Sequence, residues 1–412
     1  MGVSFFDSWE IVRSCGNMNV TDYGGGLNTG GYTRWISGYD AYYNGMKNRL
    51  NSVKAIRVDT PEGLLTLKYW LYDHLEGSPV GGVGNIYAQY FSTPGPTLPA
   101  GTPEGGKYLQ PNWGGSPSHA WTVVGFNDSI RYDFNGDGQF TNHIDINSDG
   151  VVDMRDWEFG GIKFANGYAG TGWGNSGFCY TMYKNLADKI GFGGIWNHTI
   201  YVLDVKASCE PKLTMKVTLK HTCRNKLKVT VGVSSDPAAT IPAYTHEYPI
   251  FNYQGGTLYM QGGTNEADKT IEFGLDLTPL INQIPGNQPA RYFLQVQEND
   301  PAGSDAGEIV NWALIDYTGT NPVILNSPAS NVPLVNNGLT RVHLNHALYL
   351  TKPAITTAVL PAAQIYQPYD VQLNASGGTA PYRWDVVLEY PENVNTATFP
   401  AVTAQSDRKS VV

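Results

Sequence analysis

The spacing of apolar side chains changes along the chain. In residues 61–76 leucines recur three or four positions apart, which predicts one amphipathic helix, with Thr60 as its cap and Pro61 in its first turn. A second, shorter helix is predicted over residues 182–190. From residue 209 to about residue 350, apolar and polar residues alternate instead, in runs separated by Gly, Pro, Asn and Asp. This alternation predicts an antiparallel β-sandwich.

Composition and charge narrow the class of protein. Of the 412 residues, 41% are hydrophobic and 12% aromatic, which is enough to fill several buried cores. The net charge of −9 argues against nucleic acid as a partner, and no membrane span is predicted because no run of 18 apolar residues occurs. The first residues contain Asp7 and Glu10 where a signal peptide needs an apolar core, so either the protein is cytosolic or its true start lies upstream of Met1.

Three domains follow from these changes in pattern. Residues 1–205, rich in Gly, Trp and Tyr, form the first domain, and residues 206–350 form the β-sandwich accessory domain. In the accessory domain Cys209 and Cys223 flank a predicted strand, either as a disulfide bridge or as two free thiols. Residues 353–412 resemble the start of the immunoglobulin-like modules of bacterial surface proteins, through the sequence ASGGTAPYRW, and are too few for a complete module.

Two segments of the first domain carry residues suited to catalysis. His119 comes directly before an apolar strand that ends at Gly125, and Asn166 lies near the end of a later strand, before a Gly-rich turn. Neighbouring strands can bring these two side chains together, and an Asn side chain can orient an imidazole as the third member of a Cys-His-Asn arrangement. The two segments therefore predict nucleophilic catalysis with His119 as the base.

These segments resemble the two motifs of papain-like cysteine peptidases. SHAWTVVGF matches the family's histidine motif except for Trp121 at a usually aliphatic position. NGYAGTGWG matches the asparagine motif N-S-W-G-T-G-W-G, with Tyr168 in place of tryptophan and one additional residue. The resemblance implies an α+β papain-like fold for residues 1–205. It also implies that His119 is the general base and acid, that Asn166 orients it, and that Tyr168 shields their hydrogen bond.

The nucleophile is not evident in the chain. In papain-like peptidases the catalytic cysteine lies about 130–150 residues before the histidine, which is upstream of Met1 in this numbering. Cys15 is the only cysteine before His119, but it precedes His119 by 104 residues and lacks the family's Q…C-G-x-C-W sequence. We expect a chain that is truncated at its N-terminus and inactive, with Cys15 as the alternative nucleophile.

An acidic insertion, residues 131–158, separates the two motifs. Residues 145–156 place oxygen ligands at positions 1, 3, 5, 9 and 12 of a twelve-residue loop, with glycine at position 6 and a backbone carbonyl at position 7, which is the spacing of a Ca²⁺ loop. The loop resembles dockerin-type loops, which end in Asp, and an upstream half-copy would take its last oxygen from Asp145. The alternative is a solvated acidic turn. The predicted ligands of a structural Ca²⁺ are Asp133, Asn135, Asp137, Asp145, Asn147, Asp149, Val151 (backbone carbonyl), Asp153 and Asp156.

Three functions are compatible with these features. The leading hypothesis is a secreted bacterial cysteine peptidase that acts on peptide or protein substrates, outside the cell or on its surface, with the signal peptide missing from this chain. The alternative is a calcium-stabilised cell-surface protein for adhesion or glycan binding, with a degenerate peptidase domain and contacts through the β modules. A transglutaminase-like enzyme is disfavoured, because such enzymes usually use Asp where this chain has Asn166.

Overall fold

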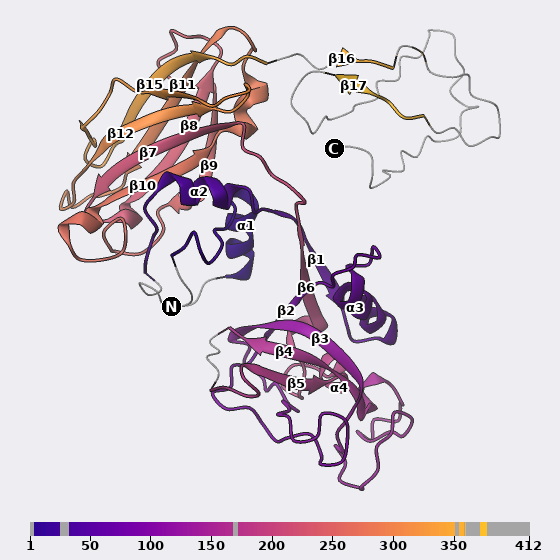
Figure 1. Cartoon of the computed structure of the whole chain (residues 1–412). Coiled ribbons are helices and arrows are strands. Elements are labelled where there is room, and N and C mark those ends of the chain that lie inside the picture. Colours follow the sequence, from indigo (N-terminus) through magenta and orange to yellow (C-terminus); the bar gives the residue numbers. More distant parts are fainter. Residues whose placement is uncertain are drawn as a thin grey trace, which may run out of the picture. The chain divides into compact units, whose positions relative to one another are not determined.

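The structure is a computed structural model that describes residues 4–24, 33–167, 172–350, 354–357, 359 and 371–376. Its contacts divide it into two compact units (Figure 1). The first unit comprises Met1–Arg49 and Ser208–Val412, and the second comprises Leu50–Ala207. The predicted immunoglobulin-like module lies largely outside the described residues, which in that part of the chain form the two-residue strands β16 (Ala354–Ile355) and β17 (Ala375–Ser376).

The second unit is built on a six-stranded antiparallel sheet with the strand order β1-β6-β2-β3-β4-β5. Its core contains the aromatic side chains Trp70, Trp113, Trp121 and Phe164, which are all nearly or fully buried. The strands are β1 (Leu50–Arg57), β2 (Gly84–Ala88), β3 (His119–Arg131), β4 (Phe159–Asn166), β5 (Phe178–Met182) and β6 (Thr199–Val205). The helices are α3 (Pro61–Asp73), α4 (Lys184–Ala187) and the 3₁₀ turns η1 (Met154–Asp156) and η2 (Trp196–His198).

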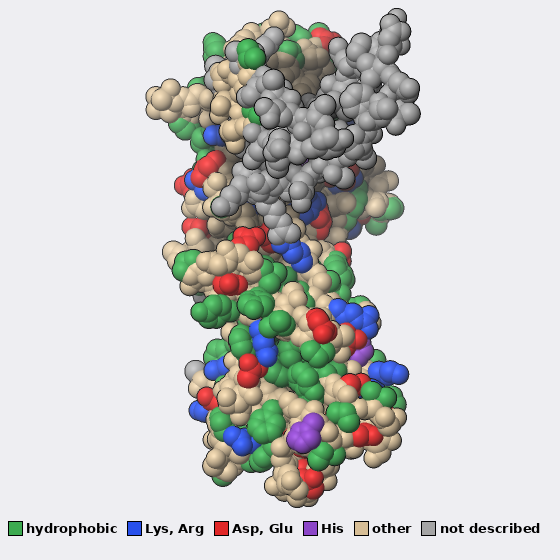
Figure 2. Space-filling view, turned by 90° about the vertical axis from the view of Figure 1, so that its right-hand side faces the viewer, with side chains coloured by type: hydrophobic (Ala, Val, Ile, Leu, Met, Phe, Trp, Pro, Cys, Tyr) green, Lys and Arg blue, Asp and Glu red, His purple; other side chains and the backbone are tan. Residues whose placement is uncertain are grey.

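Helix α3 corresponds to the helix predicted from the leucine spacing. Thr60 caps it by accepting a hydrogen bond from a first-turn amide at 3.2 Å, and the helix packs one face against β1 and β3. It ends three residues earlier than predicted, because His74 adopts a left-handed conformation with φ of 58°. Tyr69 and Tyr72 on its other face are exposed, and Figure 2 shows hydrophobic side chains gathered at the surface of this unit.

The first unit contains two antiparallel sheets that enclose one hydrophobic core. One sheet has the order β10-β7-β12-β13, with β14 also paired to β12, and the other has the order β15-β11-β8-β9. Alternating side chains of β7 and β8 face this core, as the period of two predicted. The elements are α1 (Phe5–Cys15), α2 (Tyr39–Met46), β7 (Leu213–His221), η3 (Arg224–Lys226), β8 (Leu227–Ser234), β9 (Tyr244–Asn252), η4 (Glu266–Lys269), β10 (Thr270–Asp276), η5 (Thr278–Gln283), β11 (Pro289–Glu298), β12 (Gly307–Asp316), β13 (Val323–Asn326), β14 (Val332–Pro333) and β15 (Leu339–Ala347).

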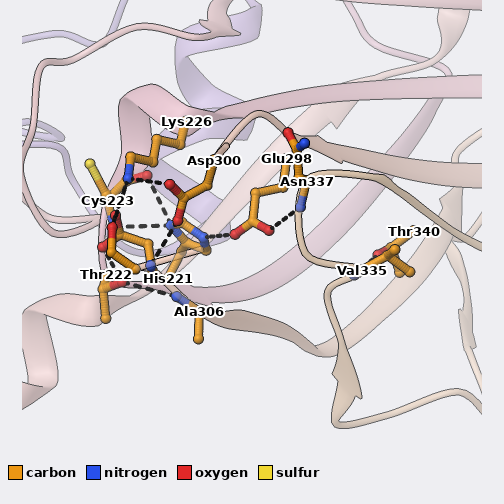
Figure 3. Close-up of polar contacts among 12 residues, drawn as sticks. His221, Thr222, Cys223, Lys226, Glu298, Asp300, Ala306, Val335, Asn337 and Thr340 are labelled. Carbon is orange, nitrogen blue, oxygen red and sulfur yellow. Dashed lines mark hydrogen bonds and ion pairs between the residues drawn. The ribbon is translucent and has the colours of Figure 1, made fainter. Parts of the chain in front are cut away.

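A buried polar cluster closes one end of the core of the first unit (Figure 3). His221 and Glu298, both almost completely buried, are joined by a bond of 2.6 Å between Nε2 and Oε1. The second oxygen of Glu298 accepts a hydrogen bond from the Asn337 amide at 3.0 Å. Lys226 pairs with Asp300 at 2.7 Å and also with Asp305. These bonds tie the end of β7 to the end of β11, and η3 to the loop that follows β11, so they contribute to the stability of this unit.

The prediction of an α+β papain-like fold is wrong. Regular structure in the described residues is mostly antiparallel strand, and the α-helices there are only 11, 8, 13 and 4 residues long. The second predicted helix, over residues 182–190, is reduced to the four residues of α4. A helical layer needs several long amphipathic helices that bury one another, and the leucine spacing provides one such helix. No helix in the described segments has both the length and the apolar character needed to cross a bilayer.

Candidate functional site

His119 and Asn166 lie together at one end of the sheet in the second unit. Strand β3 begins at His119 and the antiparallel strand β4 ends at Asn166, in a register that places Trp121 opposite Asn166. Nε2 of His119 is 3.1 Å from Oδ1 of Asn166, and the Asn166 side chain is almost completely buried. The distance is that of a hydrogen bond, in which the ring nitrogen donates and the amide oxygen accepts.

This hydrogen bond determines which ring nitrogen of His119 is basic. Since the amide oxygen of Asn166 only accepts, Nε2 carries the proton, and in the neutral imidazole the lone pair is then on Nδ1. Burial lowers the pKa of His119, and the hydrogen bond to Asn166 acts in the opposite direction. The ring is therefore neutral at neutral pH and able to accept a proton at Nδ1, as a general base must.

Aromatic rings surround the imidazole of His119. Tyr90 and Trp121 contact it edge to face, with ring centroids at 5.1 and 4.7 Å. Trp173 packs against Trp121 at 5.3 Å, and its indole N–H donates to the Phe91 carbonyl at 3.2 Å. The indole nitrogen of Trp121 is buried and has no hydrogen-bond partner among the residues that the structure describes. The rings restrict the orientation of the imidazole and exclude water from one side of it.

Part of this aromatic environment of His119 was not evident from the sequence. Tyr90 follows β2, whose last residue pairs with His119 across the sheet, so its position depends on a strand pairing that no local pattern reveals. Trp173 was part of the Gly-rich motif but received no role. Tyr168, the residue predicted to shield the hydrogen bond, lies outside the described residues.

Burial raises the pKa of the thiol in three of the four cysteines, Cys15, Cys179 and Cys223. All four are free, so Cys209 and Cys223 are not bridged. Cys15 belongs to the first unit, where burial raises the pKa of its thiol. Burial raises the pKa of Cys179 to about 12, and its thiol donates to the Tyr108 carbonyl at 3.2 Å. A nucleophilic cysteine needs the opposite shift, toward the thiolate.

The acidic insertion forms two loops with the same internal hydrogen bonds. The carboxylate of Asp133 accepts from the Gly138 amide at 2.8 Å, and Asp145 accepts from the Gly150 amide at 2.8 Å. In each loop the Asn two positions later accepts from the backbone amide two residues on, at 3.1 Å in the first loop and 2.9 Å in the second. In both loops the first Asp thus bonds the glycine at position 6, which is the turn that a Ca²⁺ loop requires.

A fully buried carboxylate closes each of the two loops. Asp156 accepts from the Ile146 amide at 3.1 Å, and Glu158 accepts from the Phe134 amide at 2.8 Å. Glu158 therefore holds in the first loop the place that Asp156 holds in the second. Glu158 was not among the ligands predicted from the sequence, because it lies 25 residues after Asp133 rather than within a twelve-residue loop.

Arg155 forms ion pairs with two of the predicted calcium ligands of the second loop. Its guanidinium pairs with Asp149 and Asp153, each at 2.6 Å, and its hydrogen bond with Asp153 raises the pKa of Arg155. Within the described residues no three Asp, Glu, His or Cys side chains converge as metal ligands. The donor atoms nevertheless fit calcium in type, since all are carboxylate, amide or backbone oxygens. Calcium binding in the second loop would require Arg155 to release both carboxylates.

No protein-family model, no curated protein and no solved structure matches this chain.

Proposed function

We propose that the second unit contains two catalytic residues of a cysteine-type peptidase. His119 is the general base and acid, and Asn166 orients its imidazole ring. The proposal rests on the 3.1 Å contact between Nε2 and Oδ1, which leaves Nδ1 as the basic atom. The lowered pKa of His119 supports it, since the ring is neutral before it accepts a proton. The substrate class is a peptide or protein.

The proposed reaction is acyl transfer in two steps. Nδ1 of His119 takes the proton of a cysteine thiol, and the thiolate attacks the carbonyl carbon of a peptide bond. The carbon–nitrogen bond breaks as His119 returns the proton to the leaving amine, which gives a thioester. Water then attacks the thioester with His119 again as the base, which releases the carboxylic acid and the thiol. Asn166 holds the ring in the tautomer that each step needs.

We infer that the thiol is none of the four cysteines, because burial raises the pKa of Cys15, Cys179 and Cys223 and because Cys209 belongs to the first unit. We therefore expect the chain alone to be inactive toward peptides. The role of His119 as the base can still be tested by adding a small thiol to the assay. The assay follows transfer of an acyl group from a p-nitrophenyl ester to N-acetylcysteamine by the full chain at pH 7. His119→Ala should abolish the protein-dependent rate and Asn166→Ala should reduce it. A rate that His119→Ala leaves unchanged would refute the proposal.

We further propose that the insertion is a structural calcium site. The matching hydrogen bonds of the two loops and their buried closing carboxylates support this proposal. In the second loop the ligands would be those predicted from the sequence, and in the first loop they would be Asp133, Asn135, Asp137 and Glu158. A bound ion would supply positive charge that holds these oxygens together. An extracellular or surface location remains part of this proposal, since calcium loops also occur in extracellular modules.

Calcium binding is tested by thermal unfolding and calorimetry on the full chain. Calcium should raise the melting temperature by mass action and EGTA should reverse the effect. Magnesium at the same concentration is the control, because it prefers a smaller octahedral site. A chain that shows neither calcium heat nor a thermal shift would have only a solvated acidic insertion. The adhesion alternative has no comparable observation among the described residues.

A further inference from the structure

An apolar cavity of about 390 Å³ lies in the first unit, beside α1, α2 and β9. Cys15 at the end of α1, Tyr42 of α2 and Phe251 of β9 line it, together with Trp35, which precedes α2. All of the lining residues belong to this one unit. The cavity has no part in the peptidase chemistry proposed above, whose residues belong to the second unit.

Two glycines set the spacing of the cavity walls. A Cβ at Gly16 would lie 2.0 Å from the carbonyl oxygen of Gly45, so only glycine allows the end of α1 to contact α2. A Cβ at Gly274 of β10 would lie 3.2 Å from Cβ of Tyr42, so α2 packs closely on the sheet. The walls are thus fixed by close backbone contacts, and the cavity between them is preformed.

The buried polar groups of the cavity already have partners within the protein. The carboxylate of Asp276 pairs with Arg49 at 2.6 Å. The Tyr248 hydroxyl donates to the backbone carbonyl of Asp276 at 2.6 Å, and the Tyr42 hydroxyl donates to that of Ile36 at 2.9 Å. Arg34 also lines the cavity, and its guanidinium already lies over the Tyr23 ring at 5.3 Å. A charged ligand would lose its hydration and would have to compete with these existing contacts, so the cavity favours an uncharged ligand.

The remaining walls combine aromatic rings and methionines with the aliphatic side chains of Ile11, Val20, Ile36 and Ile250 and with Asn17 and Asn19. Trp35 packs edge-on against Phe251 at 5.6 Å, and Tyr42 stacks on Phe251 at 6.4 Å. Met18 and Met46 line the same space. Aromatic rings favour offset or edge contacts with another ring, and thioether sulfur also packs well against aromatic edges. The lining therefore favours a flat aromatic ligand.

We propose that this cavity binds one small uncharged aromatic molecule. Its volume of about 390 Å³ is near the lower end of the roughly 300–1,000 Å³ that ligand pockets occupy, which suits one or two fused rings. Burial raises the pKa of the Cys15 thiol, so Cys15 contacts the ligand as an uncharged thiol. The thiol thereby becomes a reporter of whether the cavity is occupied.

The first test measures the alkylation of Cys15 by N-ethylmaleimide in the full chain, with and without 2-naphthol, by peptide mass spectrometry. At about ten times its Kd, 2-naphthol leaves about one site in eleven empty, so the reaction at Cys15 should slow about tenfold. Cys209, which is half-buried in the same unit, is the internal control and should react at an unchanged rate. Equal rates at Cys15 with and without 2-naphthol would overturn the proposal.

The second test fills the cavity. Cys15→Phe places a ring in the cavity and should abolish the calorimetric signal of 2-naphthol, whereas Cys15→Ser should retain it. Binding that survives in folded Cys15→Phe lies elsewhere and overturns the proposal; if that variant does not fold, the alkylation rates decide. N-acetyltryptophanamide represents an aromatic side chain of a protein partner. Protection of Cys15 by this compound but not by 2-naphthol contradicts the small-molecule proposal.

Discussion

Arg155 gives a direct test of the calcium site, because it competes with the ion for two ligands. Its guanidinium pairs with Asp149 and Asp153 at 2.6 Å. A Ca²⁺ that coordinates these carboxylates must break both pairs. Arg155→Gln removes the competing charge and leaves every predicted ligand in place, so we expect it to tighten calcium binding.

The magnitude follows from the exposure of the two pairs. The side chains concerned are 32% to 39% exposed, and ion pairs at such positions contribute roughly 0.2–1 kcal/mol each. Together the two pairs oppose calcium binding by about 0.4–2 kcal/mol. Since about 1.4 kcal/mol is a factor of ten, Arg155→Gln should lower the Kd for calcium about 2- to 30-fold.

Calorimetric titration of the full chain with calcium measures this change. Without calcium, Arg155→Gln should be slightly less stable than the wild type, because two ion pairs are lost; with calcium the order should reverse. Arg57→Gln is the matched control, since Arg57 pairs with Asp59 on an exposed surface outside the insertion and should leave the Kd unchanged. An unchanged or weaker calcium affinity in Arg155→Gln would show that Asp149 and Asp153 are not ligands.

Three further predictions concern the His119 site, the buried cluster and the thiols. Asn166→Ala should lower the pKa of His119 further, because the hydrogen bond that opposes the effect of burial is lost; an NMR titration of the imidazole measures this, and an unchanged pKa would contradict it. Glu298→Ala should destabilise the first unit by about 1–3 kcal/mol in urea unfolding, because it leaves the buried ring nitrogen of His221 without its hydrogen-bond partner, and Glu298→Gln should cost less. The chain alone should not hydrolyse a broad fluorogenic peptide, and hydrolysis that Cys15→Ser abolishes would make Cys15 the nucleophile.

The sequence predicted elements whose signal is local. The leucine spacing located α3, and the alternation located β7 and β8, because each of these elements buries one face. Of the helix predicted over residues 182–190, only the four residues of α4 are helical. Its apolar side chains pack into the core, but their spacing does not continue at the helical period beyond α4. The α+β prediction failed because two short motifs specify neighbouring strand ends and carry no information about how many helices cover a sheet.

Part of the candidate site could also be predicted, because its sequence signals are local. His119 and Asn166 each lie at the end of a strand with a strong apolar pattern, so their pairing was visible as a hypothesis. Tyr90 and Glu158 were not visible, because both reach their places through long-range contacts. Tyr90 depends on the pairing of β2 with β3, and Glu158 returns to the first loop after the whole second loop has been traversed.

The acidic insertion lies far from His119 and Asn166, so calcium binding there should affect the stability of the unit but not the geometry of this pair. The insertion joins the end of β3 to the start of β4, whereas His119 and Asn166 lie at the opposite ends of these strands. At about 3.3 Å per residue, the eight residues of β4 place Asn166 roughly 20–25 Å from the insertion. Calcium should therefore stabilise the β3–β4 hairpin without changing the geometry of the pair. We expect EGTA to lower the melting temperature and to leave the NMR-measured pKa of His119 in the folded chain unchanged. A shift of that pKa on calcium removal would contradict this separation and would show that the ion reaches the imidazole through the sheet.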